Sequence, residues 1–215
     1  MSTRNTILIT LILITAMGIL GALTWDQLPD PMASHWNIND QVDGSTSKFW
    51  GVFMMPVMSL GMLALFLLIP SIDPLKANIA KFRPTFNVFI LLLILFLGYL
   101  WALTILWNLG RTDFKMSLAL LPALGLLFIF IGLLLRKSSR NWFIGIRTPW
   151  TLSSDQVWDE THRIGSVLFI ASGILAVAGS LFGRLAFWFV FVPIIGSTIF
   201  LTIYSYVLYR RETRN

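Results

Sequence analysis

The chain alternates between long apolar runs and shorter polar connections, and this alternation predicts its fold. Six apolar runs follow one another along the sequence, at residues 6–23, 49–69, 85–107, 116–135, 164–182 and 185–209. Each run is close to the about 20 residues that a helix needs to cross the hydrocarbon core of a bilayer. Lipid cannot hydrogen-bond an exposed backbone, so a spanning run must be helical. We therefore expect an all-α polytopic membrane protein, a bundle of six transmembrane helices.

Composition supports this expectation and excludes a water-soluble globule. Hydrophobic residues make up 56% of the 215 residues and charged residues only 12%, whereas a soluble domain carries about 25% charged residues. The chain contains no cysteine, which excludes disulfides and thiolate metal sites. The net charge of +6 comes from basic residues that flank the apolar runs, so we attribute it to membrane topology and expect no direct nucleic-acid partner.

The distribution of Lys and Arg predicts the orientation of the chain. Cytoplasmic loops of membrane proteins carry an excess of these residues. With both termini in the cytoplasm, most of the 16 Lys and Arg residues lie inside. Those outside are Lys48, Arg111, Lys115 and Arg184. We therefore expect a multi-pass protein of the bacterial cytoplasmic membrane with both termini cytoplasmic, and a first run that spans rather than being cleaved as a signal peptide.

Two connections are too long to be simple turns, and they divide the chain. Residues 1–71 would hold the first two spans with an extracytoplasmic loop at 24–48. Residues 72–215 would hold four spans with a cytoplasmic loop at 136–163. Loops of this length are usually functional or disordered. Because both contain Trp, His, Pro and Gly, we expect each to be a folded cap.

The cytoplasmic loop should contain the start of a helix. Ser153 or Ser154 is suited to cap a helix that begins near Asp155 and leads into the fifth span. We expect an ion pair between Arg147 and one of the acidic residues of that helix, which are Asp155, Asp159 and Glu160. One face of this helix contains Val157, Trp158 and Thr161, whereas His162 would be turned elsewhere. This face would either meet the membrane surface or pack on the protein. The acidic residues of the helix favour packing on the protein.

The six apolar runs contain no Asp, Glu, Lys, Arg or His, and this restricts the function. Proton-coupled transport and intramembrane acid–base catalysis both need ionisable groups within the membrane. We therefore expect no catalytic residues. In the outer loop, the spacing of His35 from its neighbouring aspartates fits no known ligand pattern, so we expect no metal and no cofactor. Glycines in the runs are expected to permit close helix packing; they are Gly18, Gly21, Gly61, Gly98, Gly125, Gly132, Gly173, Gly179 and Gly196.

Both long loops resemble parts of a known family. The stretch Asn-Trp-Phe-Ile-Gly-Ile-Arg-Thr-Pro-Trp-Thr-Leu at 141–152, followed by Trp158 and Thr161-His162, resembles the signature of SdpI-type membrane proteins. The outer stretch 28–44, with His35-Trp36-Asn37 and then Lys48, resembles the extracytoplasmic domain of unknown function numbered 1648 that precedes the signature in that family. The departures are small: members often have Gly at the position of Asp40, and Ile-Pro at 31–32.

The resemblance implies a function in immunity. SdpI-type proteins protect bacteria from a secreted killing peptide that attacks the cell membrane, and some also hold a cytosolic transcriptional repressor at the membrane. The implied partners are thus the lipid bilayer, a peptide toxin and a repressor. The implied toxin contacts are His35, Trp36, Asn37, Asp43 and Lys48. The implied cytoplasmic signature is Asn141, Trp142, Gly145, Arg147, Thr148, Pro149, Trp150, Trp158, Thr161 and His162. A small permease or exporter of a peptide or lipid-like substrate stays open as the alternative.

Overall fold

The computed structural model describes residues 1–214, without the side chain of Arg184. Six of its helices are long and apolar enough to cross a membrane, as predicted. They are α1 (Thr3–Thr24), α2 (Lys48–Ile72), α3 (Lys76–Asn108), α4 (Met116–Lys137), α6 (Asp155–Gly179) and α7 (Ala186–Glu212). The shorter elements are η1 (Trp25–Gln27), β1 (Met32–Trp36), β2 (Val42–Thr46), α5 (Pro149–Ser153) and η2 (Ser180–Leu185).

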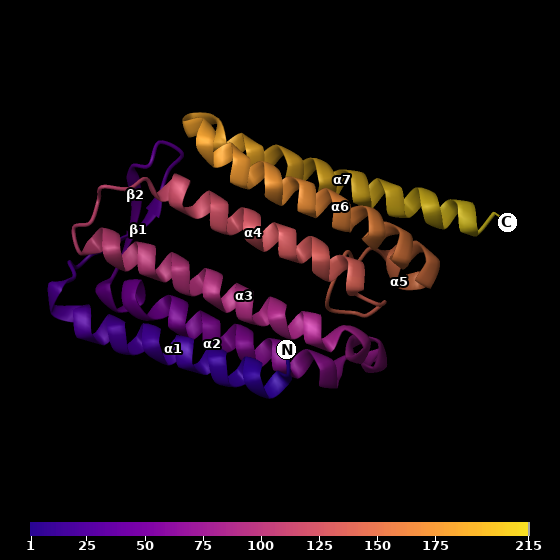
Figure 1. Cartoon of the computed structure of the whole chain (residues 1–215), viewed down its shortest axis with the longest axis horizontal. Helices are drawn as coiled ribbons and strands as arrows, with labels where there is room; N and C mark the ends of the chain where they lie inside the picture. Colours follow the sequence, from indigo (N-terminus) through magenta and orange to yellow (C-terminus); the bar gives the residue numbers. More distant parts are fainter. Residues whose placement is uncertain (215) are drawn as a thin grey trace.

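The long helices form two groups of three. Helices α1, α2 and α3 pack on one another, and α4, α6 and α7 do the same (Figure 1). The packing of α3 on α4 joins the two groups along a line that we call the seam. Because α3 packs on α1 and α2, the spatial groups differ from the sequence segments; the domain division between residues 71 and 72 stays a prediction.

Close contact between α4 and α6 depends on glycine. A Cβ atom at Gly125 would lie 2.6 Å from the carbonyl oxygen of Gly173, and the converse contact is also too short for a side chain. Small residues let helix backbones approach in this way inside a membrane. The packing interpretation is therefore confirmed here, but it is wrong for Gly18, Gly61 and Gly196, which have nothing within 4 Å of a built Cβ.

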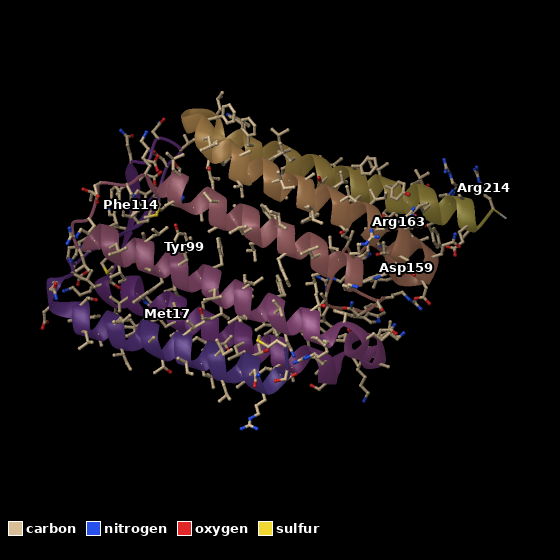
Figure 2. The ribbon with its side chains drawn as sticks, viewed as in Figure 1. Met17, Tyr99, Phe114, Asp159, Arg163 and Arg214 are labelled. Atoms are coloured by element: carbon tan, nitrogen blue, oxygen red, sulfur yellow. The ribbon has the colours of Figure 1, made fainter. Side chains whose placement is uncertain are left out.

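The two predicted caps lie at opposite ends of the bundle, as Figure 1 shows for the β-hairpin and for α5. We call the hairpin end outer and the α5 end inner, following the predicted orientation. Figure 2 shows side-chain nitrogen and oxygen atoms gathered at these two ends. The outer cap is an antiparallel pair of strands with an irregularity around His35, and these strands were not predicted. A cluster that includes Met32, Val52 and Trp101 packs the hairpin onto the helix ends.

Helix α6 begins where the sequence predicts. Ser154 caps it by accepting a hydrogen bond from the backbone N–H of Val157 at 3.2 Å. The membrane-facing orientation considered for Val157, Trp158 and Thr161 is wrong. All three are buried against the protein, and His162 is buried with them, so the other expectation, packing on the protein, is confirmed. The apolar stripe of the first turns is used for internal contacts because the preceding loop folds back over it.

Candidate functional site

The inner loop is built around Asn141, a fully buried side chain. Its Oδ1 accepts hydrogen bonds from the backbone N–H groups of Phe143 at 2.9 Å and Ile144 at 2.6 Å. Its Nδ2 donates to the carbonyl oxygens of Ser139 at 2.9 Å and Ile144 at 2.8 Å. One amide thus satisfies four backbone groups of a tight turn, which buried backbone requires in the absence of regular structure. Aspartate could not replace it, because a carboxylate donates no hydrogen bond.

His162 connects the loop to α6. Its ring stacks on Trp158 with centroids 3.9 Å apart. Nε2 accepts a hydrogen bond from the backbone N–H of Ile146 at 2.9 Å, while Nδ1 lies 2.8 Å from the carbonyl oxygen of Trp158. This pattern requires a neutral imidazole with its proton on Nδ1. His162 is therefore a packed structural residue, and the expectation that it turns away from the face with Trp158 is wrong.

The narrow space beside the rings of Trp158 and His162 explains why residue 145 is glycine. Its φ is +122°, a region that side chains rarely adopt. A Cβ atom at this position would also collide with Nε2 of His162 and lie 3.1 Å from the Trp158 ring. Trp158 is fully buried and donates its indole N–H to the carbonyl oxygen of Ser138 at 3.1 Å. The hydroxyl of Thr161 is buried too, with no hydrogen-bond partner in the described part of the chain.

Helix α5 closes the loop and links it to α7. Thr148 and Thr151 form a reciprocal capping box at its start, with Pro149 in the first turn. This combination is typical of helix N-termini. The hydroxyl of Thr148 lies 3.2 Å from that of Ser205 on α7. Trp150 packs against Tyr206 of the same helix, with ring centroids 5.1 Å apart.

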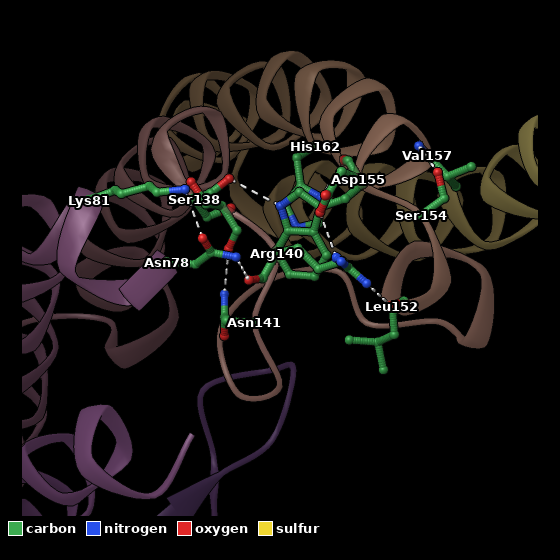
Figure 3. A network of polar contacts seen from close by, with 12 residues as sticks. Asn78, Lys81, Ser138, Arg140, Asn141, Leu152, Ser154, Asp155, Val157 and His162 are labelled. Atoms are coloured by element: carbon green, nitrogen blue, oxygen red, sulfur yellow. Dashed lines mark hydrogen bonds and ion pairs between the residues drawn. The ribbon is translucent and has the colours of Figure 1, made fainter. Parts of the chain in front are cut away.

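Arg140 forms the ion pair that was expected of Arg147. Its Nε donates to Oδ1 of Asp155 at 2.6 Å, and its Nη1 donates to the carbonyl oxygen of Leu152 at 2.7 Å (Figure 3). Arg147 instead is exposed and donates to the carbonyl oxygen of Trp142 at 2.8 Å. The prediction was wrong because the turn at Asn141 brings the start of the loop, rather than its middle, to the N-terminus of α6. A basic residue at the loop start opposite an acidic first turn is the signal that was missed.

The inner loop also joins the two helix groups. Asp73, buried just after α2, accepts hydrogen bonds from the backbone N–H of Trp142 at 2.9 Å and of Leu75 at 2.6 Å. Asn78 of α3 donates to the carbonyl oxygen of Arg140 at 2.8 Å (Figure 3). The Asn78–Arg140 and Asp73–Trp142 contacts each join residues that are more than 60 positions apart in the sequence. Neither Asp73 nor Asn78 stood out in the sequence.

At the outer end, the hairpin brings His35 and Asp43 together. His35 Nδ1 lies 2.5 Å from Oδ1 of Asp43, and both side chains are largely exposed, at 70% and 44%. Asn37 organises the connecting turn, since its Oδ1 accepts from the backbone N–H groups of Asn39 at 2.9 Å and Gln41 at 3.1 Å. Within residues 1–214 no group of three or more His, Asp and Glu side chains is arranged to hold a metal ion.

The turn of the hairpin is attached to the other helix group. Asp40 has a φ of +60°, which explains why the resembling family often has glycine there. Both of its carboxylate oxygens accept hydrogen bonds from Ser117 of α4, from the backbone N–H and from the hydroxyl, each at 2.7 Å. This link spans the seam at the outer end, as Asp73 and Asn78 do at the inner end.

Trp36 and Lys48 have different surroundings. Trp36 packs edge-on against Trp107 with centroids 5.6 Å apart, and its buried Nε1 has no hydrogen-bond partner among the described residues. Lys48 donates from Nζ to the carbonyl oxygen of Trp25 at 3.2 Å and lies over the Trp25 ring. The backbone N–H of Lys48 donates to Asp30 at 3.1 Å. Lys48 therefore holds the two ends of the loop together. It makes no contact with the His35–Asp43 pair.

Two cavities lie along the seam, one toward each end. The outer cavity has a volume of about 590 Å³ and a largely apolar lining from the hairpin, α2, α3, α4, η2 and α7, including His35, Trp36 and Phe187. The inner cavity has a volume of about 350 Å³ and is lined by α2, α3, α4, α6 and the loop, including Phe89 and Phe143. The predicted outer residues His35, Trp36 and Asn37 thus border a space that could accept an apolar ligand.

Six membrane-spanning helices, an outer β-hairpin and an inner loop folded on a buried Asn–Trp–His set define a polytopic membrane protein with an ordered cap at each end. Comparison with known proteins shows that it is similar to SdpI-type membrane proteins. The SdpI/YfhL protein family model matches residues 137–205, and the model of a domain of unknown function (DUF1648) matches residues 12–60. The Immunity protein SdpI of Bacillus subtilis (strain 168) is 27% identical over 95% of this chain and 96% of its own length. No solved structure matches.

The matched segments contain both predicted sites. Residues 12–60 include the hairpin with the helices on either side of it, and residues 137–205 include the inner loop, α5, α6 and much of α7. Asp73 and Asn78 lie outside both segments. The contacts that close the seam at the inner end therefore join the SdpI-matched part to two residues that neither model matches.

Proposed function

We propose that this chain protects its own cell from a secreted, membrane-active peptide by binding that peptide at the outer face. The observation that supports this most is the similarity to an immunity protein over nearly the full length of both chains. Binding rather than turnover agrees with six apolar runs that contain no Asp, Glu, Lys, Arg or His.

The outer cavity is the proposed binding site. An apolar side chain of the peptide would enter the space beside Trp36, where burial of apolar surface contributes about 25 cal/mol per Å². The indole N–H of Trp36 would donate to a carbonyl oxygen of the peptide, because this buried donor otherwise stays unsatisfied at a cost of about 1–3 kcal/mol. His35, which pairs with the exposed Asp43, lines the same cavity, and the pair is available to polar groups of the peptide.

We propose the inner loop as the surface that a cytosolic repressor would contact. Most of the loop is buried, but Trp142 is 51% exposed and Arg147 is exposed beside it. Exposed Trp and Arg side chains are common anchors of protein interfaces. Recruitment controlled by the toxin would require two conformations with different toxin affinity. The hydrogen bonds that close the seam at each end are the contacts that such a change would break.

A permease is the second candidate, and the two cavities along the seam favour it. Transporters alternate access by rocking one group of helices against another around a central site. Reconstitution into vesicles separates the two functions. Protection without flux of the peptide supports binding, whereas flux that depends on the protein supports transport.

The test of the proposed site is a challenge of a sensitive strain with candidate killing peptides. Trp36→Ala should lower the peptide concentration that the cells survive at least tenfold, because it removes both the donor and a wall of the cavity. The matched control is Trp50→Ala, since Trp50 is 50% exposed on α2 and does not line the cavity. Protein levels in the membrane are measured for both variants. Equal protection by Trp36→Ala and wild type would contradict the proposal.

A further inference from the structure

A groove at the inner end has no part in the function proposed above. It lies between the end of α2 and the start of α3 and has a volume of about 590 Å³. Its lining combines two basic side chains, Lys76 and Arg83, with an apolar wall that includes Leu67, Pro70 and Ile79. No acidic residue lines it. The nearest carboxylate in sequence, that of Asp73, is already bound by two backbone N–H groups.

The basic groups of this groove lack anionic partners. In the described part of the chain, Lys76 Nζ makes no hydrogen bond or ion pair. Arg83 donates from Nε to the hydroxyl of Thr3 at 3.4 Å and lies over the Phe86 ring, while its Nη1 is buried and has no partner among the described residues. A buried guanidinium N–H without an acceptor costs more than a neutral one. An anion in the groove would supply the negative charge that Lys76 and Arg83 lack among the described residues.

The backbone of α3 is interrupted beside this groove. Phe82 departs from helical geometry inside α3, with φ −117° and ψ 15°, two residues before Pro84. Proline lacks the N–H that would bond the carbonyl four residues earlier, and its ring clashes with that carbonyl, so the helix kinks in the turn before Pro84. The first turns of α3, with Lys76, are thus set apart from the rest of the helix, and Arg83 follows directly after the break.

The position of the groove determines which anion suits it. The inner end is the cytoplasmic one by the distribution of Lys and Arg, and basic pockets at such helix ends bind anionic lipid headgroups. The neighbouring residues Leu68 and Ile72 are about half exposed, at 51% and 48%, and α2 continues from them into the membrane. An amphipathic ligand can use both the basic and the apolar part of the lining, whereas a free phosphate would use only the first.

We propose that this groove binds an anionic phospholipid of the inner leaflet. Lys76 and Arg83 hold its phosphate, and the wall at Leu67 and Pro70 contacts the beginning of an acyl chain. The proposal is independent of toxin binding, because none of these residues borders the outer cavity.

The experiment uses the purified full-length protein in detergent, with equal amounts of phosphatidylglycerol and phosphatidylcholine added. Native mass spectrometry counts the lipids retained. Wild type should retain phosphatidylglycerol in preference, and Lys76→Ala should reduce that retention about fivefold, the effect of one basic residue near an anionic lipid surface. Lys137→Ala is the matched control, because it removes an exposed Lys at the same end from α4.

A double variant extends the test. Lys76→Ala with Arg83→Gln should bind the two lipids equally. Loss of the Arg83–Thr3 contact could prevent the double variant from folding, which gel filtration would reveal. In that case the single variant Lys76→Ala provides the test of the lipid site. Equal retention by Lys76→Ala and Lys137→Ala, or no preference in wild type, would overturn the proposal. Inorganic phosphate is added as competitor: failure to displace the lipid supports a lipid site, and displacement would show a site for a free anion instead.

Discussion

The two caps of this protein use their signature residues in opposite ways. In the inner loop, Asn141, Trp158 and His162 are at most 2% exposed, and their polar atoms are bonded within the protein. In the outer hairpin, His35 and Asp43 are largely exposed and bond chiefly to each other. The comparison teaches that a sequence signature can specify a fold at one end of a molecule and offer a contact surface at the other.

The difference follows from how the two segments satisfy their backbone. The hairpin pairs its own strands, so its side chains are available for other contacts. The inner loop has no regular structure between α4 and α5, so side chains must bond its N–H and C=O groups. Residues used in this way cannot also bind a partner, which leaves Trp142, Arg147 and Pro149 as the exposed part of the inner signature.

The largest effect is expected from His162→Ala. The change removes the acceptor of the Ile146 N–H and the ring that stacks on Trp158, which leaves a cavity and an unsatisfied donor. We expect a loss of about 3 kcal/mol in the free energy of unfolding, measured by thermal unfolding in detergent. Arg163→Ala is the control, because its exposed side chain pairs only with Glu160 and should change stability by less than about 1 kcal/mol. Similar unfolding temperatures for both variants would show that the inner signature is not structural.

A smaller but clear effect is expected from Gly145→Ala. A methyl group here must occupy space taken by His162 and Trp158, on a backbone with positive φ. The expected loss is about 2 kcal/mol. Gly196→Ala, on α7 with open space around it, should leave the unfolding temperature unchanged. The structural reading of the loop is wrong if Gly145→Ala is tolerated as well as Gly196→Ala.

The smallest effect on stability is expected from Arg147→Ala, although it changes the same signature. The side chain is exposed and makes one hydrogen bond, to Trp142, so the loss should be about 0.5 kcal/mol. If the inner surface contacts a cytosolic repressor, the variant should release that repressor from the membrane fraction while protection from the toxin persists. Arg210→Ala, at the exposed end of α7, serves as control. Retention of the repressor by Arg147→Ala would exclude this residue from the contact.

Prediction from the sequence succeeded where a local property decides the outcome. The spans, the Ser154 cap and the two ordered loops all follow from runs of neighbouring residues. Prediction failed for Arg147, because the choice between Arg140 and Arg147 as partner of Asp155 depends on the direction that the loop takes after Asn141. The strands of the hairpin were missed because Met32–Trp36 lacks the alternation of apolar and polar residues that strands show when one face is buried.

The six membrane spans follow from the sequence alone, and the positions of Lys and Arg predict how they are oriented. The reason is that the bilayer acts on each segment separately, through its hydrophobicity, its backbone hydrogen bonds and its flanking charges. The polar pairs that meet across the seam, such as Asp40 with Ser117 and Asp73 with Trp142, and the positions of the cavities follow from the packing of the two helix groups. Those contacts join residues far apart in the chain, and their energies depend on how whole helices pack rather than on any one segment.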